Sequence, residues 1–195
     1  ESIIFVLKAD LSSIICMWRK ANRLKNFPKF RRFGNVFRFI DDLNAMNDGG
    51  EFERCYKDIY PPELELKKEN NENFHASFLD LDITINDNHT FSLKLYDKRD
   101  AFPFSIVRLP YLSSNMPSRI FYSALSGELL RIARCTSESN DFCKSCKTLL
   151  QRVRKQGAKP RRLNTTLSKT FNSHLNEFSL FYKSDSEFRQ NVLHN

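Results

Sequence analysis

Two adjacent aspartates, Asp41 and Asp42, directly follow the aromatic run in the stretch NVFRFIDDLNAMNDGG, residues 35 to 50. Paired carboxylates offer the hard oxygen ligands that suit Mg²⁺ and the metal-assisted chemistry that depends on it. An Asp-Asp pair after a strand is also a common exposed turn, because aspartate accepts local hydrogen bonds there. The residues themselves leave both interpretations open.

Basic residues form a second candidate feature, and the chain has a formal net charge of +8. Between residues 19 and 38 they alternate with phenylalanines, a pattern that suits nucleic acid but is equally that of a solvated segment with aromatics in the core. The stretch from 131 to 169 is the most cationic part of the chain. Its side chains are expected to contact phosphates without reading sequence. The candidates there are Arg131, Arg134, Arg152, Arg154, Lys155, Arg161 and Arg162.

The cysteines and the N-terminal stretch bear on the cellular compartment. Five cysteines form an odd set without the spacing of a disulfide framework, which favours a reducing, intracellular location, nuclear or cytoplasmic. Cys143 and Cys146 make half of a zinc pattern with no second pair nearby, so we expect no metal there. The apolar N-terminal stretch is interrupted by Lys8 and Asp10 and is neither a signal peptide nor a membrane span, so we expect no membrane partner.

The elements that must position these residues can be read from hydrophobic periodicity. The stretch FRFIDDL predicts a strand that runs into a turn at the two acids, so that the pair lies at the tip of a β-turn-β unit. A turn at 47–50, a helix at 51–59 and a strand at 63–67 are predicted to follow. Residues 74–85 and 90–98 predict a two-stranded hairpin. Three-and-four spacing then predicts helices over about 118–136, 140–157 and 163–182. The sequence therefore predicts an α+β fold, with antiparallel strands and helices in residues 1–105 and an all-helical region at 106–195.

Several segments in order resemble the reverse transcriptases of eukaryotic retroelements, most nearly the Penelope-like elements and their relatives. FIDD at 39–42 resembles the family's aromatic-x-Asp-Asp box, with Phe39 where tyrosine is usual, and YPPELELKKEN resembles the lysine-bearing segment that follows it. SFLDLDITI resembles the next strand, and LKLYDKRDAFPF the tyrosine and basic strand at the primer grip. LPYLSSNMPSRIFYSALSGELLRIARCTSESNDF resembles the helices read as thumb.

The resemblance implies a partial polymerase palm at 1–105 and a helical thumb-like region at 106–195. It implies that Asp41 and Asp42 belong to a two-metal Mg²⁺ site for nucleotidyl transfer onto a primer 3′ hydroxyl, with Asp41 as the direct ligand. The leaving-group lysine corresponds to Lys67 or Lys68, and we take Lys68. Three residues of the primer-grip strand, Tyr96, Lys98 and Arg99, are then expected to contact nucleic acid, so the partners would be an RNA template with a DNA primer, or an RNA/DNA hybrid.

Departures from the family pattern qualify the expected activity. ADL at 9–11 resembles the end of the helix that follows the family's template-positioning glycine segment, so that segment and the strand carrying the other metal-binding aspartate are expected before residue 1. By family the protein is an RNA-directed DNA polymerase, but we expect no primer extension by this chain alone. Two alternatives are a non-catalytic nucleic-acid-binding remnant and a fold relic with no partner.

Overall fold

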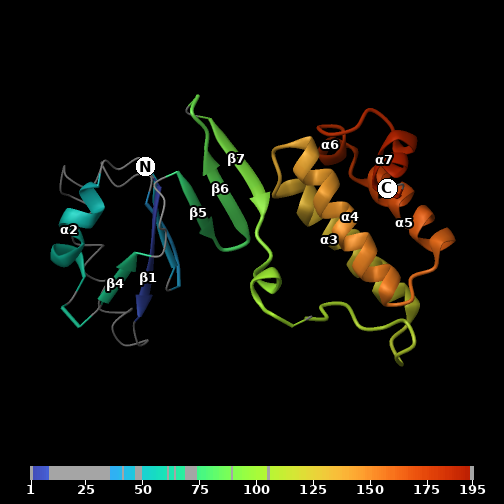
Figure 1. Ribbon diagram of the computed structural model, residues 1–195, viewed down its shortest axis with the longest axis horizontal. Coiled ribbons are helices and arrows are strands. Elements are labelled where there is room, and N and C mark those ends of the chain that lie inside the picture. The colour runs from blue at the N-terminus through green and yellow to red at the C-terminus, as the bar shows by residue number, and fades with distance from the viewer. Residues whose placement is uncertain are drawn as a thin grey trace. The chain divides into compact units, whose positions relative to one another are not determined.

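The computed structural model describes residues 2–8, 36–40, 42–46, 50–60, 62–63, 65–68, 74–88, 90–104 and 106–193. Strands occupy the first part of the chain and helices the second, so the α+β class is confirmed (Figure 1). Two compact units, Glu1–Phe91 and Ser92–Asn195, make up the chain. The division falls within strand β7 (Phe91–Leu95). The assignment of 1–105 to a palm and 106–195 to a thumb stays a prediction.

The first unit contains a four-stranded sheet in the order β2-β3-β1-β4. Each pair of neighbours is antiparallel, and helix α2 (Glu51–Ile59) confirms the helix predicted at those residues. Leu43, Ala45, Phe52 and Tyr60 are buried together, and the Phe52 and Tyr60 rings meet edge-on at 6.3 Å. The strands are β1 (Ser2–Lys8), β2 (Val36–Phe39), β3 (Asp42–Met46) and β4 (Glu65–Lys68).

A tight turn separates β2 from β3, in agreement with the predicted strand that runs into a turn at the two acids. Phe39 pairs with Asp42, so only Ile40 and Asp41 connect the strands. Ile40 has a φ of 52°, a left-handed conformation that is unfavourable for a β-branched residue but required by the turns that join two-residue hairpins. The alternating pattern continues through the acids because the chain reverses there and re-enters the sheet.

A second hairpin replaces the single strand predicted over residues 74–85. Residues 74–85 form β5 (His75–Phe78) and β6 (Leu81–Ile85), which pair antiparallel with Phe78 opposite Leu81. The turn residue Leu79 again has a positive φ, 56°. Asp80 therefore lies in the turn, whereas Asp82 lies in β6 and accepts hydrogen bonds from Ser77 and His75, both at 2.8 Å. Neither turn contains the glycine or asparagine that signals a hairpin in sequence.

The second unit is a helical bundle that follows β7 in the chain. Its helices are α3 (Ser118–Arg134), α4 (Ser139–Lys155), α5 (Pro160–Ser173), α6 (Leu175–Phe178) and α7 (Asp185–Leu193). The single helix predicted over 163–182 is wrong, because the chain breaks at His174 (φ −130°, ψ 45°). The break turns the backbone so that Phe178 enters the core, where its ring meets those of Phe142 and Phe171 at 5.8 Å each.

Phe142 lies at the centre of the bundle's aromatic core. Its fully buried ring stacks on Phe181 at 4.2 Å and on Phe188 at 6.1 Å. Aromatic rings bury large apolar areas, and pairs of them contribute beyond that area. Phe142 of α4 thus packs against α6, α7 and the residues between these two helices.

Replacing Phe142 by alanine should lower the free energy of unfolding of the second unit by about 3 to 5 kcal/mol, because the cavity cannot close among so many rigid rings. Urea unfolding followed by far-ultraviolet circular dichroism measures this loss. The matched control Leu180→Ala removes a side chain that is 76% exposed and should change the stability by less than about 0.5 kcal/mol. Equal losses for the two variants would contradict the packing described here.

Candidate nucleic-acid interface

Asp42, the second member of the candidate acidic pair, follows the β2–β3 turn. Asp41 lies outside the described residues, whereas Asp42 is the first residue of β3 and is partly buried. The side chain of Arg38 fixes the turn from β2, since its Nε donates to the Ile40 carbonyl at 2.9 Å. Its guanidinium also lies 5.9 Å from the centre of the Tyr60 ring. Burial raises the pKa of Tyr60 even though Arg38 opposes this shift.

Sheet register distinguishes the two candidate lysines. Val6 of β1 pairs with Asp42 on one side and with Lys67 on the other. Residues directly opposite one another across a sheet share a face, so Asp42 and Lys67 lie on the same face. Lys68 instead shares a face with the buried Leu43, through Phe5. The register therefore favours Lys67 over Lys68 as a partner of the acidic turn, and both lysines are exposed.

A magnesium site needs several oxygen donors close together. Strand β1, which lies directly beside β3, has the sequence SIIFVLK and contributes no carboxylate. Within the described ranges, no group of three or more His, Cys, Asp or Glu residues could hold a metal ion. These residues alone do not supply the donor set of a two-metal site, and the magnesium expectation stays a prediction that includes Asp41.

In the second unit, Asp97 binds two of the predicted phosphate-contacting arginines. Arg99 donates from Nε and Nη2 to the two carboxylate oxygens at 2.7 and 2.6 Å. Arg152, from α4, donates to the same carboxylate at 2.7 Å. Burial alone would raise the pKa of Asp97, but the hydrogen bonds from Arg99 and Arg152 outweigh it and hold the pKa well below its ordinary range. This carboxylate therefore stays ionised and keeps both guanidinium groups in place.

Two further carboxylates engage other predicted arginines. Glu128 of α3 pairs with Arg108 at 2.9 Å and with Arg131 at 3.5 Å. Glu177 pairs with Arg134 at 2.8 Å, and hydrogen bonding from Arg134 lowers the pKa of Glu177. Four of the predicted nucleic-acid contacts, Arg99, Arg131, Arg134 and Arg152, are thus already bonded to carboxylates of the chain, and a phosphate would have to compete with those carboxylates.

The remaining basic candidates gather where α4 ends and α5 begins. Helix α4 ends at Lys155, Gly157 adopts a positive φ of 94°, and α5 starts at Pro160. Gly157 thus follows the end of α4 in the left-handed conformation that glycine commonly adopts there. We call the exposed cations here the α4–α5 corner: Arg154, Lys155, Lys159, Arg161 and Arg162. Lys159 was not among the predicted contacts, although the same basic run indicates it.

The corner has no acidic residue near it in sequence, since none occurs from 142 to 176. The nearest ones along the chain are Asp141 and Glu177. Lys98 is also exposed and Tyr96 is partly buried; both lie beside the Asp97 cluster and apart in sequence from the corner. Among the predicted basic residues, Arg99, Arg131, Arg134 and Arg152 are thus bonded to carboxylates, Arg154, Lys155, Arg161 and Arg162 lie in the corner, and Lys98 belongs to neither group.

Cys143 and Cys146 lie on α4. Cys146 is fully buried in the bundle core, and burial raises the pKa of its thiol. Cys143 is partly exposed, and its Sγ donates to the Asn191 carbonyl at 3.7 Å. Cys146 thus packs within the bundle core, and Cys143 connects α4 to α7.

Comparison of the chain with protein-family models, with curated proteins and with solved structures found no match in any of the three. Among the helices that the structure describes, none has the length and apolar character needed to cross a membrane.

The Asp97 cluster makes a prediction about acid stability. A carboxylate whose folded pKa is depressed stabilises the fold above its unfolded pKa, about 3.9 for aspartate, and that contribution is lost as the pH falls toward the folded pKa. Asp97→Asn should therefore be less stable than the original chain at pH 7, and the difference should shrink below about pH 4.

Thermal unfolding monitored by circular dichroism between pH 7 and pH 2.5 measures this convergence. Asp87→Asn, in an exposed turn, removes the same charge and controls for net charge. A stability difference for Asp97→Asn that stays constant over the whole pH range would show that the ion pairs contribute nothing.

Proposed function

We propose that this chain is the palm-and-thumb portion of a retroelement reverse transcriptase, and that by itself it binds primer–template nucleic acid without extending the primer. The observation that carries the binding part is the α4–α5 corner. Its cations are exposed, closely spaced and unopposed by acidic residues along 35 positions of sequence, 142 to 176. Such a surface attracts a polyanion and holds it through its phosphates.

The position of two corner residues strengthens this interpretation. Arg161 and Arg162 lie in the first turn of α5, which contains no acidic residue. The N-terminus of a helix carries partial positive charge and unpaired N–H groups, so cations are unfavourable there and anions are favourable. An external phosphate would relieve this repulsion and accept hydrogen bonds from the same turn. The arrangement is a poor choice for stability and a suitable one for binding an anion.

The polymerase part of the proposal is supported by the order of the family-like segments and by the position of the acidic turn. A short connection between antiparallel strands places Asp42, which follows Asp41 in the sequence, at one end of a hairpin. In a complete polymerase, these residues would bind Mg²⁺, which supplies the chemistry of nucleotidyl transfer. Lys67, on the face of Asp42, is the residue of this chain best placed to protonate a leaving group.

A non-catalytic binding remnant is the second candidate, and β1 is the observation that favours it. The strand beside Asp42 carries no carboxylate, whereas two-metal chemistry requires carboxylates from more than one element. The two candidates share the binding surface and differ in whether the acidic turn takes part in nucleotidyl transfer.

The binding proposal predicts salt-dependent affinity for an RNA/DNA hybrid. The plot of log K against log salt should be steep, because each phosphate contact releases counterions. The double variant Arg161→Gln/Arg162→Gln should reduce the magnitude of the slope by about 1 to 2 and weaken binding by at least about ten-fold. Fluorescence anisotropy with a labelled hybrid between 50 and 300 mM salt provides both quantities.

The matched control is Arg119→Gln/Lys183→Gln, which removes two exposed cations outside the corner and should leave the slope nearly unchanged. If both double variants behave alike, net charge and not the corner governs binding. If the original chain shows no binding at 50 mM salt, the proposed function is wrong.

Primer extension tests the catalytic half of the proposal. With Mg²⁺, deoxynucleotides and a primed RNA template, the chain alone should produce no extension, and Asp41→Asn should bind the hybrid within about two-fold of the original chain, because these carboxylates serve the chemistry and not the binding. Measurable extension by the chain alone would show that its residues already form a working site. A large loss of hybrid affinity in Asp41→Asn would place the acidic turn in the binding surface.

A further inference from the structure

Helix α4 carries a row of polar and cationic side chains that runs from the α4–α5 corner toward the start of the helix. Lys144, Lys147, Gln151 and Lys155 follow one another at steps of three or four residues, and we call them the α4 row. Residues at this spacing share one face of a helix, and the opposite face of α4 is buried in the bundle core. Lys144, Gln151 and Lys155 are exposed, and Lys147 is partly exposed. The row covers about 16 Å of helix.

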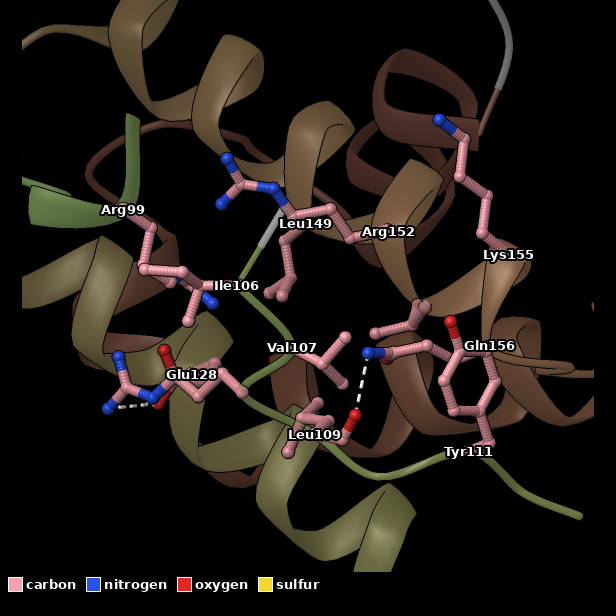
Figure 2. Close-up of a pocket in the computed structure, with 12 residues that line it drawn as sticks. Arg99, Ile106, Val107, Leu109, Tyr111, Glu128, Leu149, Arg152, Lys155 and Gln156 are labelled. Atoms are coloured by element: carbon pink, nitrogen blue, oxygen red, sulfur yellow. Dashed lines mark hydrogen bonds and ion pairs between the residues drawn. The ribbon is translucent and has the colours of Figure 1, made fainter. Parts of the chain in front are cut away.

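Lys155 belongs to both the row and the corner. It lies in the last turn of α4, and Figure 2 shows it at the opposite end of a cleft from Glu128. Two other cations of that cleft are held by carboxylates, since Arg108 pairs with Glu128 at 2.9 Å and Arg152 with Asp97 at 2.7 Å. These carboxylates neutralise the cations beside them, whereas Lys155 is exposed and can meet an external anion.

The lysines of the row lack the acidic neighbours that usually accompany lysine on a helix surface. An acid four residues from a lysine stabilises a helix, but every residue of α4 that lies four positions from Lys144, Lys147 or Lys155 is uncharged. The nearest acid, Asp141, lies three residues before Lys144 in the first turn, where it complements the helix N-terminus. Lys144 and Lys147 are neighbours of like charge and repel each other. The row is thus better suited to an external anion than to water alone.

Aromatic side chains are also missing from this basic stretch. The sequence contains none from 143 to 170, and the rings at its two ends, Phe142 and Phe171, are buried in the bundle core. Proteins that bind single strands combine cations with aromatic side chains on which unpaired bases stack. The row and the corner offer cations without such a stacking surface, so we expect them to contact phosphates and not bases.

A duplex is the form of nucleic acid that such a surface favours. It carries one negative charge per about 1.7 Å of its axis, about twice the charge density of either strand. Its phosphates are also held in fixed positions, so less conformational freedom is lost when they bind to a rigid helix. A single strand compensates for its lower charge by base stacking, which this surface does not provide.

We propose that the α4 row lies along the phosphates of a nucleic-acid duplex that also contacts the α4–α5 corner, and that the row favours a duplex over a single strand. Nucleic acid as the polyanion rests on the proposed function. The extent of the surface and the choice of a duplex rest on the spacing of the lysines and on the absence of acidic and aromatic neighbours. One continuous surface on α4 and the start of α5 then contacts a single ligand.

The direct test compares Lys144→Gln/Lys147→Gln with the original chain by fluorescence anisotropy, using a labelled RNA/DNA hybrid and the DNA strand of that hybrid alone. The variant should weaken hybrid binding by about five- to ten-fold and reduce the magnitude of the salt slope by about 1 to 2, because two phosphate contacts are lost. Binding of the single strand should weaken by less than about two-fold. Equal losses for the hybrid and the single strand would overturn the inference.

Two further variants separate the row from net charge. Lys144→Arg/Lys147→Arg keeps both charges and should bind the hybrid within about two-fold of the original chain, because phosphate contacts require the charge and not the lysine itself. Arg119→Gln/Lys183→Gln removes two exposed cations elsewhere and should leave hybrid affinity nearly unchanged. If this control weakened hybrid binding as much as Lys144→Gln/Lys147→Gln does, the row would have no role of its own. Circular dichroism establishes that each variant is folded.

The corner variant Arg161→Gln/Arg162→Gln distinguishes this inference from the proposed function. If the row and the corner contact the same duplex, the chain should bind one hybrid, and combining the two double variants should lower the salt slope by the sum of their separate effects. Two hybrids bound per chain at saturation would show separate sites and overturn the inference. Hybrid binding that depends on the corner and not on the row would leave the proposed function standing and overturn the inference. Dependence on the row and not on the corner would support the row and contradict the observation on which the proposed function rests.

Discussion

The carboxylate of Asp97 is shared by two guanidinium groups, one from its own segment and one from α4. A single carboxylate cannot neutralise two arginines, so the cluster retains positive charge while each of its members is fixed in position. Asp97 lies two residues after β7 and attaches the segment after this strand to α4, and Glu128 of α3 binds Arg108 of the same segment. These two carboxylates therefore connect the non-helical segment to two helices of the bundle.

The same ion pairs decide which of the many basic residues can meet an external anion. Arginines bonded to a partly buried carboxylate have already exchanged water for a charged partner, and a phosphate must displace that partner to gain full contact. Residues of the α4–α5 corner are exposed and lie in a long acid-free stretch. Within the described part of the chain, this corner joins a helix C-terminus to a helix N-terminus and leaves its cations open to an external anion.

The acidic turn in the first unit illustrates how sheet order constrains chemistry. In the order β2-β3-β1-β4, the strand beside Asp42 determines which side chains can join it, and that strand is apolar apart from its terminal residues. The tightness of the connection has its own cost, since Ile40 adopts a positive φ that glycine or asparagine would adopt more easily. A bulky residue in such a position indicates that the turn is imposed by the pairing of the strands and not by local preference.

Local periodicity in the sequence determined the α+β class, helix α2 and the start of the bundle, and Gly157 marked the end of α4, because these features depend on neighbouring residues. The sequence also placed Arg131, Arg134, Arg152 and Arg154 on helices that the structure contains. It did not reveal the hairpin turn at Leu79, because strand pairing overrides the local preference of that residue, or the break at His174, which is set by the burial of Phe178. Only the tertiary structure decided which arginines are bonded to carboxylates and that Lys67 shares a face with Asp42, because these relations join residues far apart in the chain.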